Sequence, residues 1–285
     1  MSAERRTPTT PRFVAEQVLP DVRIVPASAV FLHEDSDPAR VARLTARLRE
    51  EGILRNPPIA APLSDGGFVV LDGANRTGAL RALGASAIPL HVVDYDDPKV
   101  RVEVWHHLLP HPADLSTRLR AQSLSLRVGT IADAARWLAE RAVACYLVMP
   151  TGVAAVPTAP SMRALATVLA QVVGTYKHAT RTYRVLSADL EGLAAHYGPV
   201  GAVVVFPTFS KHEIREMAHA PTKLPAGVTR HVTSGRALRV NVPVEVLSSP
   251  SPVEEKHQWL QERIHQQLLD DRIRYYPEGT FLFDE

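Results

Sequence analysis

The sequence predicts a mixed α/β (α+β) fold, with an N-terminal lobe that extends to about residue 110 and a larger mixed C-terminal lobe. Segments with helical periodicity alternate with short apolar, strand-like runs from residue 22 onward. The 285 residues are enough for one large or two small domains. Hydrophobic residues make up 46% of the chain and charged residues 22%, which excludes a largely disordered protein.

We divide the chain into a flexible tail at residues 1–20, an N-terminal lobe at 21–110 and a C-terminal lobe at 111–285. In the N-terminal lobe, Asp37 followed by Pro38 is typical of a helix start, and Gly52 marks the end of that helix. The run 68–71 predicts a strand that ends at Asp72-Gly73 and leads directly into a second helix, which closes at Gly84.

Two further strands complete the N-terminal lobe, at residues 88–93 and 99–105. In the second strand, Val100, Val102 and Val104 share one face. Trp105 therefore lies on the opposite, polar face, away from the valines. A tryptophan that only packs in a core is expected among the valines, although core packing is the commoner role of a single tryptophan, so both alternatives stay open at this point.

The C-terminal lobe is predicted to be mostly helical between residues 115 and 198, with helices near 130–145, 161–173 and 187–196. Two Ser-x-x-Glu patterns, at 210–213 and 251–254, predict capping boxes at the start of helices. Apolar or alternating runs predict strands at 201–206, 239–246 and 280–283.

Composition and charge exclude several classes of protein. The 32 Lys and Arg residues nearly balance the 30 Asp and Glu residues, which argues against a nucleic-acid-binding protein, although a local basic pocket remains compatible with this balance. The single cysteine, Cys145, excludes an intrachain disulfide and a Cys-based zinc site. The tail has no apolar core of a signal peptide, and the apolar stretch 142–157 is too short for a membrane span. We therefore expect a cytoplasmic protein without membrane contacts.

The segment from Val70 to Leu80 is the most informative motif. A strand runs into an Asp-Gly turn and then into a helix that carries Arg76 in its first turn. Free backbone N–H groups at a helix start, together with a guanidinium, form an anion site. The alternative is a structural turn in which Asp72 is the N-cap and Arg76 is a surface residue.

A second acidic motif, His33-Glu34-Asp35-Ser36-Asp37-Pro38, precedes the first predicted helix. Capping and the helix dipole account for Asp37, but Glu34 lies too early to serve the cap. Near an anion site, the Glu34 carboxylate could take a hydroxyl proton or help to hold Mg²⁺. The histidines 106, 107 and 111 suggest a metal or haem site, but Pro110 and Pro112 interrupt the segment, and we assign no protein metal site.

Four segments together resemble the ParB/sulfiredoxin superfamily, and more narrowly its free L-serine kinase branch. They are HEDSDPxRVxxLxxxLxxEGxLRNPPI from residue 33, FVVLDGANRTGALRALG from 68, KLPAGVTRH from 223 and RYYPEGTF from 274. The resemblance covers nearly the whole chain and is weakest between residues 115 and 200. It implies phosphoryl transfer from ATP or ADP, with Mg²⁺, to free L-serine, giving O-phospho-L-serine.

The resemblance also implies a role for each matching residue. Glu34 corresponds to the catalytic carboxylate, and Asp72 to an acid beside the phosphates that assists Glu34 or the Mg²⁺. Residues of the Asp-Gly turn would bind the nucleotide phosphates: Gly73, Ala74, Asn75, Arg76 and Thr77. Residues of the amino-acid pocket would bind serine: Trp105, Thr229, Arg230 and His231.

One departure and two neighbouring families limit this assignment. The branch usually has Asp-Gly-His-His-Arg, whereas this chain has Ala74-Asn75 in place of the two histidines. Asn75 still donates a hydrogen bond but carries no positive charge. A sulfiredoxin needs a cysteine in this turn, and a ParB partition protein needs a basic recognition helix; neither is present. A regulator that binds nucleotide or DNA without kinase activity, and a kinase of another hydroxyl-bearing amino acid, remain alternatives, and the choice between ATP and ADP and the oligomeric state stay open.

Overall fold

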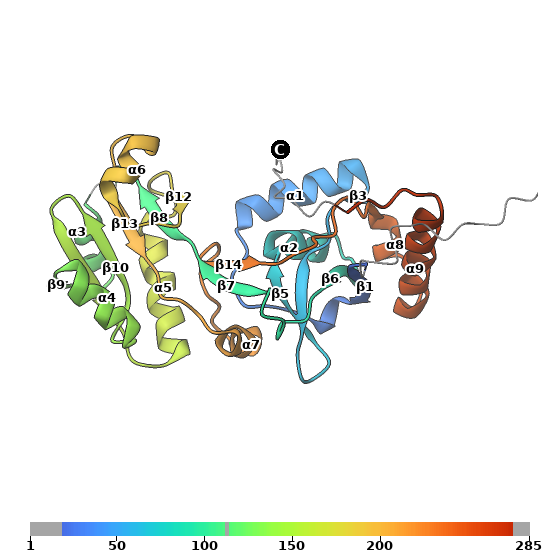
Figure 1. Cartoon of the computed structure of the whole chain (residues 1–285), viewed down its shortest axis with the longest axis horizontal. Coiled ribbons are helices and arrows are strands. Elements are labelled where there is room, and N and C mark those ends of the chain that lie inside the picture. The colour runs from blue at the N-terminus through green and yellow to red at the C-terminus, as the bar shows by residue number, and fades with distance from the viewer. Residues whose placement is uncertain (1–18, 112–113, 276–285) are drawn as a thin grey trace, which may run out of the picture.

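A computed structural model of the chain describes residues 19–111 and 114–275, and these residues form two lobes that lie side by side (Figure 1). The N-terminal lobe contains a five-stranded mixed sheet in the order β1-β6-β4-β5-β2. Its strands are β1 (Asp21–Pro26), β2 (Val30–Leu32), β4 (Ile59–Pro62), β5 (Phe68–Asp72) and β6 (Ala87–Val92). Two pairs are parallel, β2 with β5 and β4 with β6, and the others are antiparallel.

Helices α1 (Pro38–Glu51) and α2 (Ala74–Ala82) pack against each other beside this sheet. The predicted limits of α1 are confirmed: the Asp37 carboxylate accepts the Arg40 N–H at 3.0 Å, and Gly52 ends the helix with φ +68°. Strand β5 also leads into α2 as predicted. The alternative structural turn differs in one respect, because Gly73 and not Asp72 is the N-cap of α2, and no side chain caps that helix.

The C-terminal lobe has three layers, with helices on both faces of a six-stranded antiparallel sheet in the order β12-β8-β13-β10-β11-β9. The strands are β8 (His106–Leu109), β9 (Arg127–Gly129), β10 (Val143–Met149), β11 (Gly152–Pro157), β12 (Tyr183–Val185) and β13 (Ala202–Val205). Helices α3 (Leu115–Ala121) and α5 (Met162–Tyr176) share a core with one face of the sheet. Helices α4 (Ile131–Ala139) and α6 (Leu190–Tyr197) share a core with the other face.

The helices expected near 161–173 and 187–196 are confirmed as α5 and α6, but the expectation that residues 115–198 are mostly helical is wrong, and the helix expected near 130–145 is shorter. Strands β9 to β12 lie in this region, and α4 ends at Ala139, before β10 begins at Val143. Six of the seven residues of β10 are buried, because helices cover both of its faces. A strand buried on both faces reads as a continuous apolar run, and such a run cannot be distinguished from a buried helix by its period.

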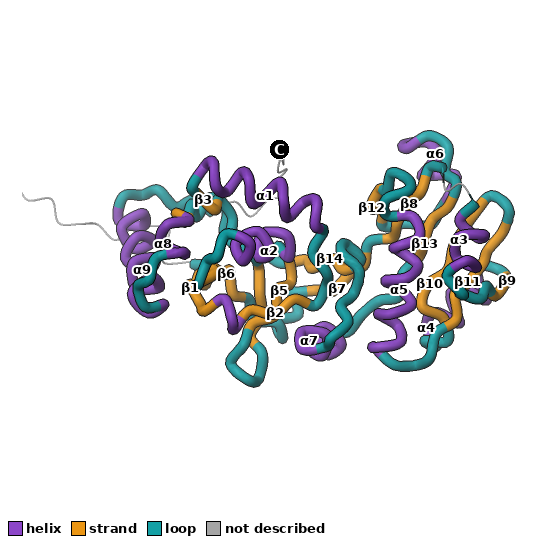
Figure 2. Tube along the Cα trace, turned by 180° about the vertical axis from the view of Figure 1, so that it is seen from behind, coloured by secondary structure: helices purple, strands orange, loops and turns teal. Residues whose placement is uncertain are grey.

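The chain returns to the N-terminal lobe after the C-terminal sheet. Helix α7 (Lys211–His219) contacts β2 and β5, and its capping box at Ser210 and Glu213 is confirmed. Strand β14 (Thr229–Val232) then pairs with β7 (Arg101–Val104), and β15 (Val242–Pro243) pairs with β3 (Ile53–Leu54). Both pairs link segments that are far apart in the sequence (Figure 2).

The last helices, α8 (Val244–Ser248) and α9 (Val253–Leu269), also pack on the N-terminal lobe, against β6 and β1. Leu247 and Leu260 lie in the same buried cluster as Val22 and Ile88. The sequence-based division placed all of 111–285 in the C-terminal lobe. In the structure, the part of this range that contains β15, α8 and α9 instead completes the core of the N-terminal lobe. Hydrophobic periodicity shows that a helix has a buried face but not which sheet it covers.

Two smaller expectations for this segment are also wrong. The alternation at 239–246 forms only the short strand β15, after which Val244 begins α8. Helix α9 starts at Val253 with Pro252 as N-cap and no side-chain cap, so the capping box expected at 251–254 does not form. The strand expected at 280–283, most of the RYYPEGTF segment and nearly all of the expected tail lie outside the described residues.

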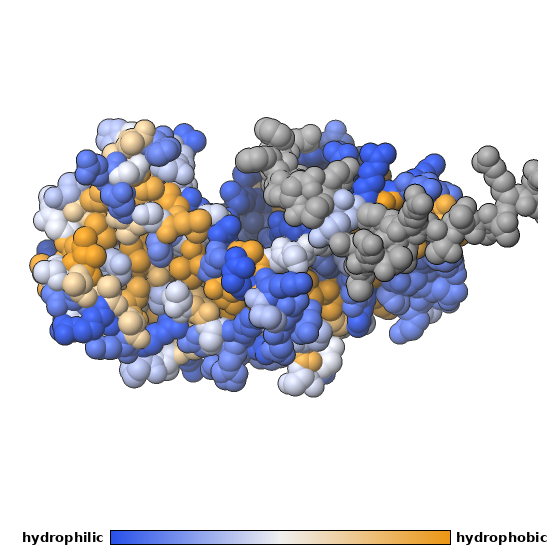
Figure 3. Space-filling model, in the orientation of Figure 1, coloured by the Kyte–Doolittle hydropathy of each residue, from blue (hydrophilic) through white to orange (hydrophobic). Residues whose placement is uncertain are grey.

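The surfaces of the two lobes differ. In the view of Figure 3, apolar residues gather on the face of the C-terminal lobe, whereas the visible face of the N-terminal lobe is largely hydrophilic. Within the part of the chain that the structure describes, no helix is both long and apolar enough to cross a bilayer.

Candidate functional site

The parallel pair β2–β5 determines where the site forms. Leu32 lies opposite Val70 in this pair, so both strands end at the same edge of the sheet. Glu34 follows β2 by two residues, and Asp72 is the last residue of β5. The two predicted carboxylates therefore lie at one edge of the sheet, each just before a helix.

The segment that carries Glu34 is fixed by a strand-like contact with the loop before β14. The Asp35 N–H donates to the Leu224 carbonyl at 2.8 Å, and the Leu224 N–H donates to the His33 carbonyl at 3.0 Å. This contact brings residues 227–229 of the KLPAGVTRH segment directly against Glu34, as the hydrogen bonds of its carboxylate show.

The Glu34 carboxylate is buried, with 9% of the residue exposed, and neutral groups hold it. Oε1 accepts the Thr229 backbone N–H and also the Thr229 hydroxyl, the latter at 2.6 Å. Oε2 accepts the Gly227 N–H at 2.8 Å. Each carboxylate oxygen has two acceptor positions. Among the described residues, Oε2 thus keeps one position without a donor.

His33 continues the same hydrogen-bond chain. Its Nδ1 lies 2.7 Å from the Val70 carbonyl oxygen, and its Nε2 lies 2.8 Å from the Thr229 hydroxyl. The imidazole is 3% exposed, and burial lowers the pKa of His33 below its usual value, although the charge of Glu34 opposes this shift. Thr229, predicted as a serine-binding residue, therefore connects Glu34 to His33.

Gly227 connects Glu34 to the C-terminal lobe. Its carbonyl lies 3.3 Å from Nε2 of His107, and the other ring nitrogen of His107 lies 2.8 Å from the Tyr176 hydroxyl. Gly227 has φ +82°, and a Cβ there would lie 2.0 Å from a guanidinium nitrogen of Arg184 in β12. Glycine thus allows both the left-handed backbone and the close approach of Arg184.

The environment of Asp72 is the opposite of that of Glu34. Its side chain is 42% exposed and pairs with two guanidinium groups, those of Arg76 at 3.3 Å and of Arg236. Arg76 also donates to the carbonyls of Asn56 and Pro57 at 3.0 and 3.1 Å. The predicted anion turn therefore carries a second arginine, Arg236, which is distant in the sequence.

The other residues of the turn have structural contacts of different kinds. Gly73 has φ +105° and packs closely on Pro58, where a Cβ would lie 3.0 Å from it. The Asn75 side-chain oxygen accepts the Asp37 N–H at 2.7 Å and so joins this turn to α1. Ala74 begins α2, whereas Thr77 is fully buried and its amide bonds to the Gly73 carbonyl.

The predicted serine-binding residues fall into two groups, because neighbouring residues of β14 point to opposite faces: Thr229 and His231 face His33, whereas Arg230 faces Trp105, which directly follows β7. Arg230 pairs with Glu103, and its guanidinium carbon lies 4.8 Å from the centre of the Trp105 ring. Trp105 therefore contacts a polar partner, as its position opposite the valines predicts. Nε2 of His231 lies 2.8 Å from the Tyr95 hydroxyl, and burial lowers the pKa of His231 well below its usual value.

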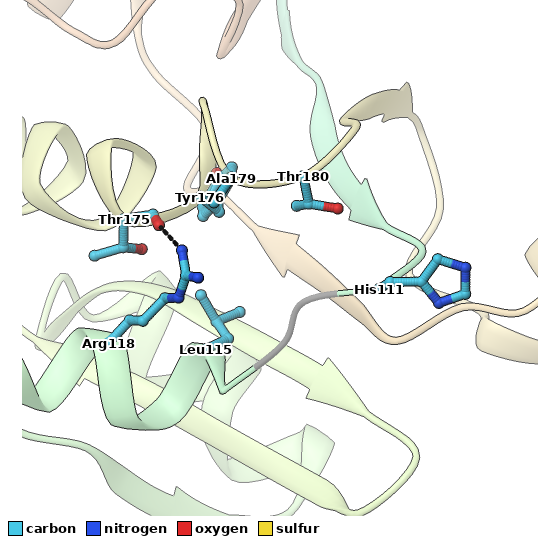
Figure 4. A pocket seen from close by; sticks show the side chains of 7 residues that line it. All are labelled: His111, Leu115, Arg118, Thr175, Tyr176, Ala179 and Thr180. Atoms are coloured by element: carbon cyan, nitrogen blue, oxygen red, sulfur yellow. Dashed lines mark hydrogen bonds between the residues drawn. The ribbon is translucent and has the colours of Figure 1, made fainter.

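The three histidines considered for a metal site have separate environments. His107 is buried in the contacts described above, and burial lowers its pKa to about 4. Nδ1 of His106 accepts the Phe206 N–H at 3.4 Å. His111 lines a cavity of about 20 Å³ with residues of α3 and α5, including Arg118 and Thr175 (Figure 4). Such a volume holds at most a water molecule.

Sequence reasoning missed several of these residues. His33 and Gly227 lie inside recognised motifs, and their burial and the positive φ are the signals that identify them only in three dimensions. Arg236, Tyr95 and Arg184 have no sequence signal, because the partner of each is more than 20 residues away.

Comparisons with known proteins find relatives among proteins named as L-serine kinases. No family model matches the chain. The chain is 24% identical over 270 residues to the ATP-dependent L-serine kinase SbnI of Staphylococcus aureus, covering 93% of this chain and 97% of that protein. It is 32% identical over 84 residues to an ATP-dependent L-serine kinase of Staphylothermus marinus, covering 29% of this chain and 33% of that protein.

Solved structures show the same fold. A C-terminally truncated SbnI from Staphylococcus aureus has a TM-score of 0.67 at 21% identity and covers 86% of this chain and 96% of that one. A free serine kinase in complex with AMP has a TM-score of 0.69 at 18% identity and covers 83% of this chain and 98% of that one. These relatives confirm the predicted mixed α/β fold and the resemblance to the free L-serine kinase branch.

Proposed function

We propose that this protein is a free L-serine kinase, a phosphotransferase that moves a terminal phosphoryl group from ATP or ADP to the serine hydroxyl and gives O-phospho-L-serine. Relatives named as ATP-dependent L-serine kinases support the reaction class. One observation carries the proposal within this chain. A buried carboxylate with one open acceptor position lies at the same sheet edge as an arginine-lined helix start.

Glu34 is the group for the acceptor hydroxyl. Its open position on Oε2 can accept the serine hydroxyl, which aligns the serine oxygen for attack and receives its proton. The proton leaves the serine oxygen as that oxygen bonds to phosphorus, and the nucleotide departs with the electron pair of the broken P–O bond. Only 9% of Glu34 is exposed, which limits the competition of water with serine for this position.

Arg76 and Arg236, with the amides of the Gly73–Asn75 turn, are the groups for the phosphates. Phosphoryl transfer depends mainly on positioning and on neutralising the phosphate charge. Two guanidinium groups next to a helix start supply the positive charge that neutralises the phosphates. Asp72 pairs with both arginines and so orients them at the sheet edge.

The residues present also fit Mg²⁺. The described residues contain no cluster of three His, Cys, Asp or Glu side chains that could form a metal cage. Magnesium in kinases needs no such cage, because one or two carboxylates and the substrate phosphates hold it. Asp72 is the carboxylate at the phosphate turn and would contribute to this binding. When bound, Mg²⁺ supplies positive charge to the phosphates.

Trp105, Thr229, Arg230 and His231 would form the amino-acid side of the site. Arg230 is already paired with Glu103 and stacked on Trp105, so its orientation does not depend on the ligand. We place this metabolic reaction in the cytoplasm. The balanced overall charge gives no support to a nucleic acid partner.

A direct assay tests the proposal. The purified protein is incubated with Mg²⁺, L-serine and either ATP or ADP, and O-phosphoserine is measured by mass spectrometry. We expect product with at least one nucleotide, and the productive nucleotide identifies the donor. Absence of O-phosphoserine with both nucleotides would contradict the function.

The Ala74-Asn75 departure makes the acceptor worth testing in the same assay. L-Threonine and L-homoserine present a similar hydroxyl and amino acid group, and each is offered in competition with L-serine. We expect phosphoserine to dominate. A larger yield of another phosphorylated amino acid would assign the enzyme to that acceptor and retain the same chemistry.

A further inference from the structure

A guanidinium group from the C-terminal lobe lies close to the Glu34 carboxylate. Arg184 is the central residue of β12. Its guanidinium packs on Gly227, where a Cβ would lie 2.6 Å from its Cζ and 2.7 Å from its Nε. Within the residues that the structure describes, Arg184 forms no hydrogen bond or ion pair, although the charge of Glu34 acts on it. An unpaired guanidinium in this place is suited to bind an anionic ligand.

The pairing of β12 with β8 holds Arg184 in this place. Arg184 lies opposite His107 in this antiparallel pair, so the two side chains leave the same face of the sheet. Nε2 of His107 contacts the Gly227 carbonyl at 3.3 Å, so both side chains end at Gly227. The Gly227 N–H in turn donates to Oε2 of Glu34, the oxygen with the open acceptor position. A single residue, Gly227, therefore connects Arg184 to that oxygen.

The charges around Arg184 leave it available for a ligand. Besides Glu34, the acid that acts on it is Asp37, which already caps α1 and pairs with Lys177 at 3.1 Å. Arg40 adds a second positive charge nearby. Burial lowers the pKa of Arg184, but an arginine stays charged at any pH of an assay. The residue as a whole remains exposed, so a small ligand can reach it.

Of the two anionic reactants, serine is the one that still lacks a cation. The phosphates have Arg76 and Arg236 at the helix start. Arg230 is already paired with a carboxylate and lies on the face of β14 opposite to the side chain that holds Glu34. The carboxylate of serine lies within a few ångströms of its hydroxyl, so serine bound at Glu34 brings a second negative charge close to the first. A cation beside Glu34 offsets this repulsion.

We propose that Arg184 binds the carboxylate of the acceptor amino acid and so makes the site specific for a free amino acid. A guanidinium donates two parallel N–H groups to a carboxylate, which neither an amide nor an ester matches in strength. The serine hydroxyl lies on Oε2 of Glu34 and the serine carboxylate on Arg184, so the molecule is held at both ends. This inference rests on the proposed function, and it adds a residue of the C-terminal lobe to the site.

Arg184→Ala tests the contact with two acceptors. L-Serinamide differs from L-serine only in an uncharged amide that replaces the carboxylate. We expect KM for L-serine to rise by roughly ten- to a hundredfold, the usual loss of a charge-assisted pair, with a smaller change in kcat. KM for L-serinamide should be high in the wild type and should not change in the variant. A merely structural role would change both acceptors together.

Two further variants serve as controls. Arg184→Lys keeps the charge without the planar fork and should recover part of the affinity for L-serine. Arg120→Ala removes an exposed arginine from α3 of the same lobe and should leave both KM values unchanged. An unchanged KM for L-serine in Arg184→Ala would overturn the proposal. An equal loss of kcat with both acceptors would also overturn it, because the guanidinium would then act on the transferred phosphoryl group.

A binding measurement without turnover separates this proposal from the proposed function. L-Serine is titrated calorimetrically into protein saturated with AMP, which has no terminal phosphoryl group to transfer. We expect the wild type and Arg120→Ala to bind equally and Arg184→Ala to show the same loss as in KM. This result in a protein that makes no phosphoserine would contradict the reaction and support the contact. Equal affinities of the wild type and Arg184→Ala, or no binding of L-serine, would overturn the contact even in a protein that makes phosphoserine.

Discussion

Two strand-to-helix turns meet at one edge of the N-terminal sheet, and they differ in their electrostatics. The turn between β2 and α1 presents Glu34, which is buried and held by amides and a hydroxyl. The turn between β5 and α2 presents Asp72, which is half-exposed and held by two guanidinium groups. The two turns have different backbones, a five-residue connection that Asp37 caps and a single left-handed Gly73, and their opposite environments fit the proposed proton acceptance at one and phosphate binding at the other.

The difference shows how a single sheet edge can serve two reactants. A carboxylate whose hydrogen-bond donors are neutral remains available to accept a proton. A carboxylate between two arginines keeps those arginines oriented for an incoming anion. Substitutions at one turn should therefore change the rate, and those at the other should change nucleotide affinity.

Glu34→Gln tests the first turn most directly. We expect kcat to fall by about 10²–10⁴-fold, the usual contribution of a general base, while the nucleotide dissociation constant stays unchanged. Steady-state kinetics and isothermal titration calorimetry measure the two quantities. Asp35→Asn, which removes the adjacent exposed carboxylate, is the matched control and should retain its rate. A near-normal rate in Glu34→Gln would remove Glu34 from the chemistry.

Acidification should lower the folding stability of the protein through His107, the residue of the C-terminal lobe that contacts Gly227. His107 has a pKa near 4 in the folded protein and about 6.5 when unfolded, so the unfolded chain binds more protons between these values. Stability is therefore fully present above pH 6.5 and is lost as pH falls toward 4, by about 3 kcal/mol from this group. Denaturant unfolding at several pH values measures the slope.

His107→Gln provides the comparison for that slope. Glutamine does not titrate, so its unfolding free energy should depend less steeply on pH than that of the wild type. Other buried histidines with lowered pKa values, His91 and His106 among them, contribute in the same direction and remain in both proteins. Equal slopes would show that His107 is not a neutral, buried group.

Gly227→Ala should disturb Glu34 through the backbone. Arg184 is flexible and can move away from the new Cβ, so the main cost is the positive φ, about 1–2 kcal/mol of folding stability. Because the Gly227 N–H holds Oε2 of Glu34, kcat should fall as well. Gly84→Ala has a similar φ of +75° in open space and is the matched control. It should lose similar stability and keep its kcat; equal kcat in the two variants would contradict the anchoring role.

Arg76→Ala tests the second turn. We expect nucleotide affinity to fall by roughly tenfold, the loss of one charge-assisted contact to phosphate, with a smaller change in KM for serine. Calorimetric titration with ATP and ADP measures it. Arg49→Ala, at an exposed position in the last turn of α1, is the control for the loss of positive charge. Unchanged affinity in Arg76→Ala would contradict the phosphate-binding role of the turn.

Asn75→Ala tests the link between the turns, and its effect should be the smallest. It removes the acceptor of the Asp37 N–H, which costs about 1 kcal/mol of stability. Asn75→Asp keeps an oxygen at that position and should recover the stability but bind nucleotide more weakly, because it adds a negative charge. Thermal unfolding and nucleotide titration distinguish these effects. An unaltered melting temperature in Asn75→Ala would show that the two turns are independent.

The local elements around the two turns were predictable because each carries its own signal. The Asp37-Pro38 start, the Gly52 end and the Asp-Gly turn depend on residues within four positions of each other. Sequence patterns and the family resemblance together also predicted Glu34, Asp72 and Arg76 as site residues, and this stays a prediction. Their convergence at one edge follows from the parallel pairing of β2 and β5, which the sequence alone does not state.

The remaining features depend on contacts between distant parts of the chain. Strand β10 lacks the alternation of a strand because both of its faces are buried. By its pattern alone, the amphipathic helix α9 could pack on either lobe. Its contacts with β1 place it on the N-terminal lobe. Arg236 and His33 acquire their roles from partners 164 and 196 residues away, Asp72 and Thr229.

The distance along the chain between Glu34 and its donors has a consequence for biosynthesis. The donors at Gly227 and Thr229 lie 193 and 195 residues after Glu34. The core of the N-terminal lobe is completed only by α8 and α9, which are made last. On the proposed function, a growing polypeptide therefore carries the nucleotide turn long before Gly227 and Thr229 can hold the Glu34 carboxylate. A chain that ends before residue 227 lacks both donors and is expected not to phosphorylate serine.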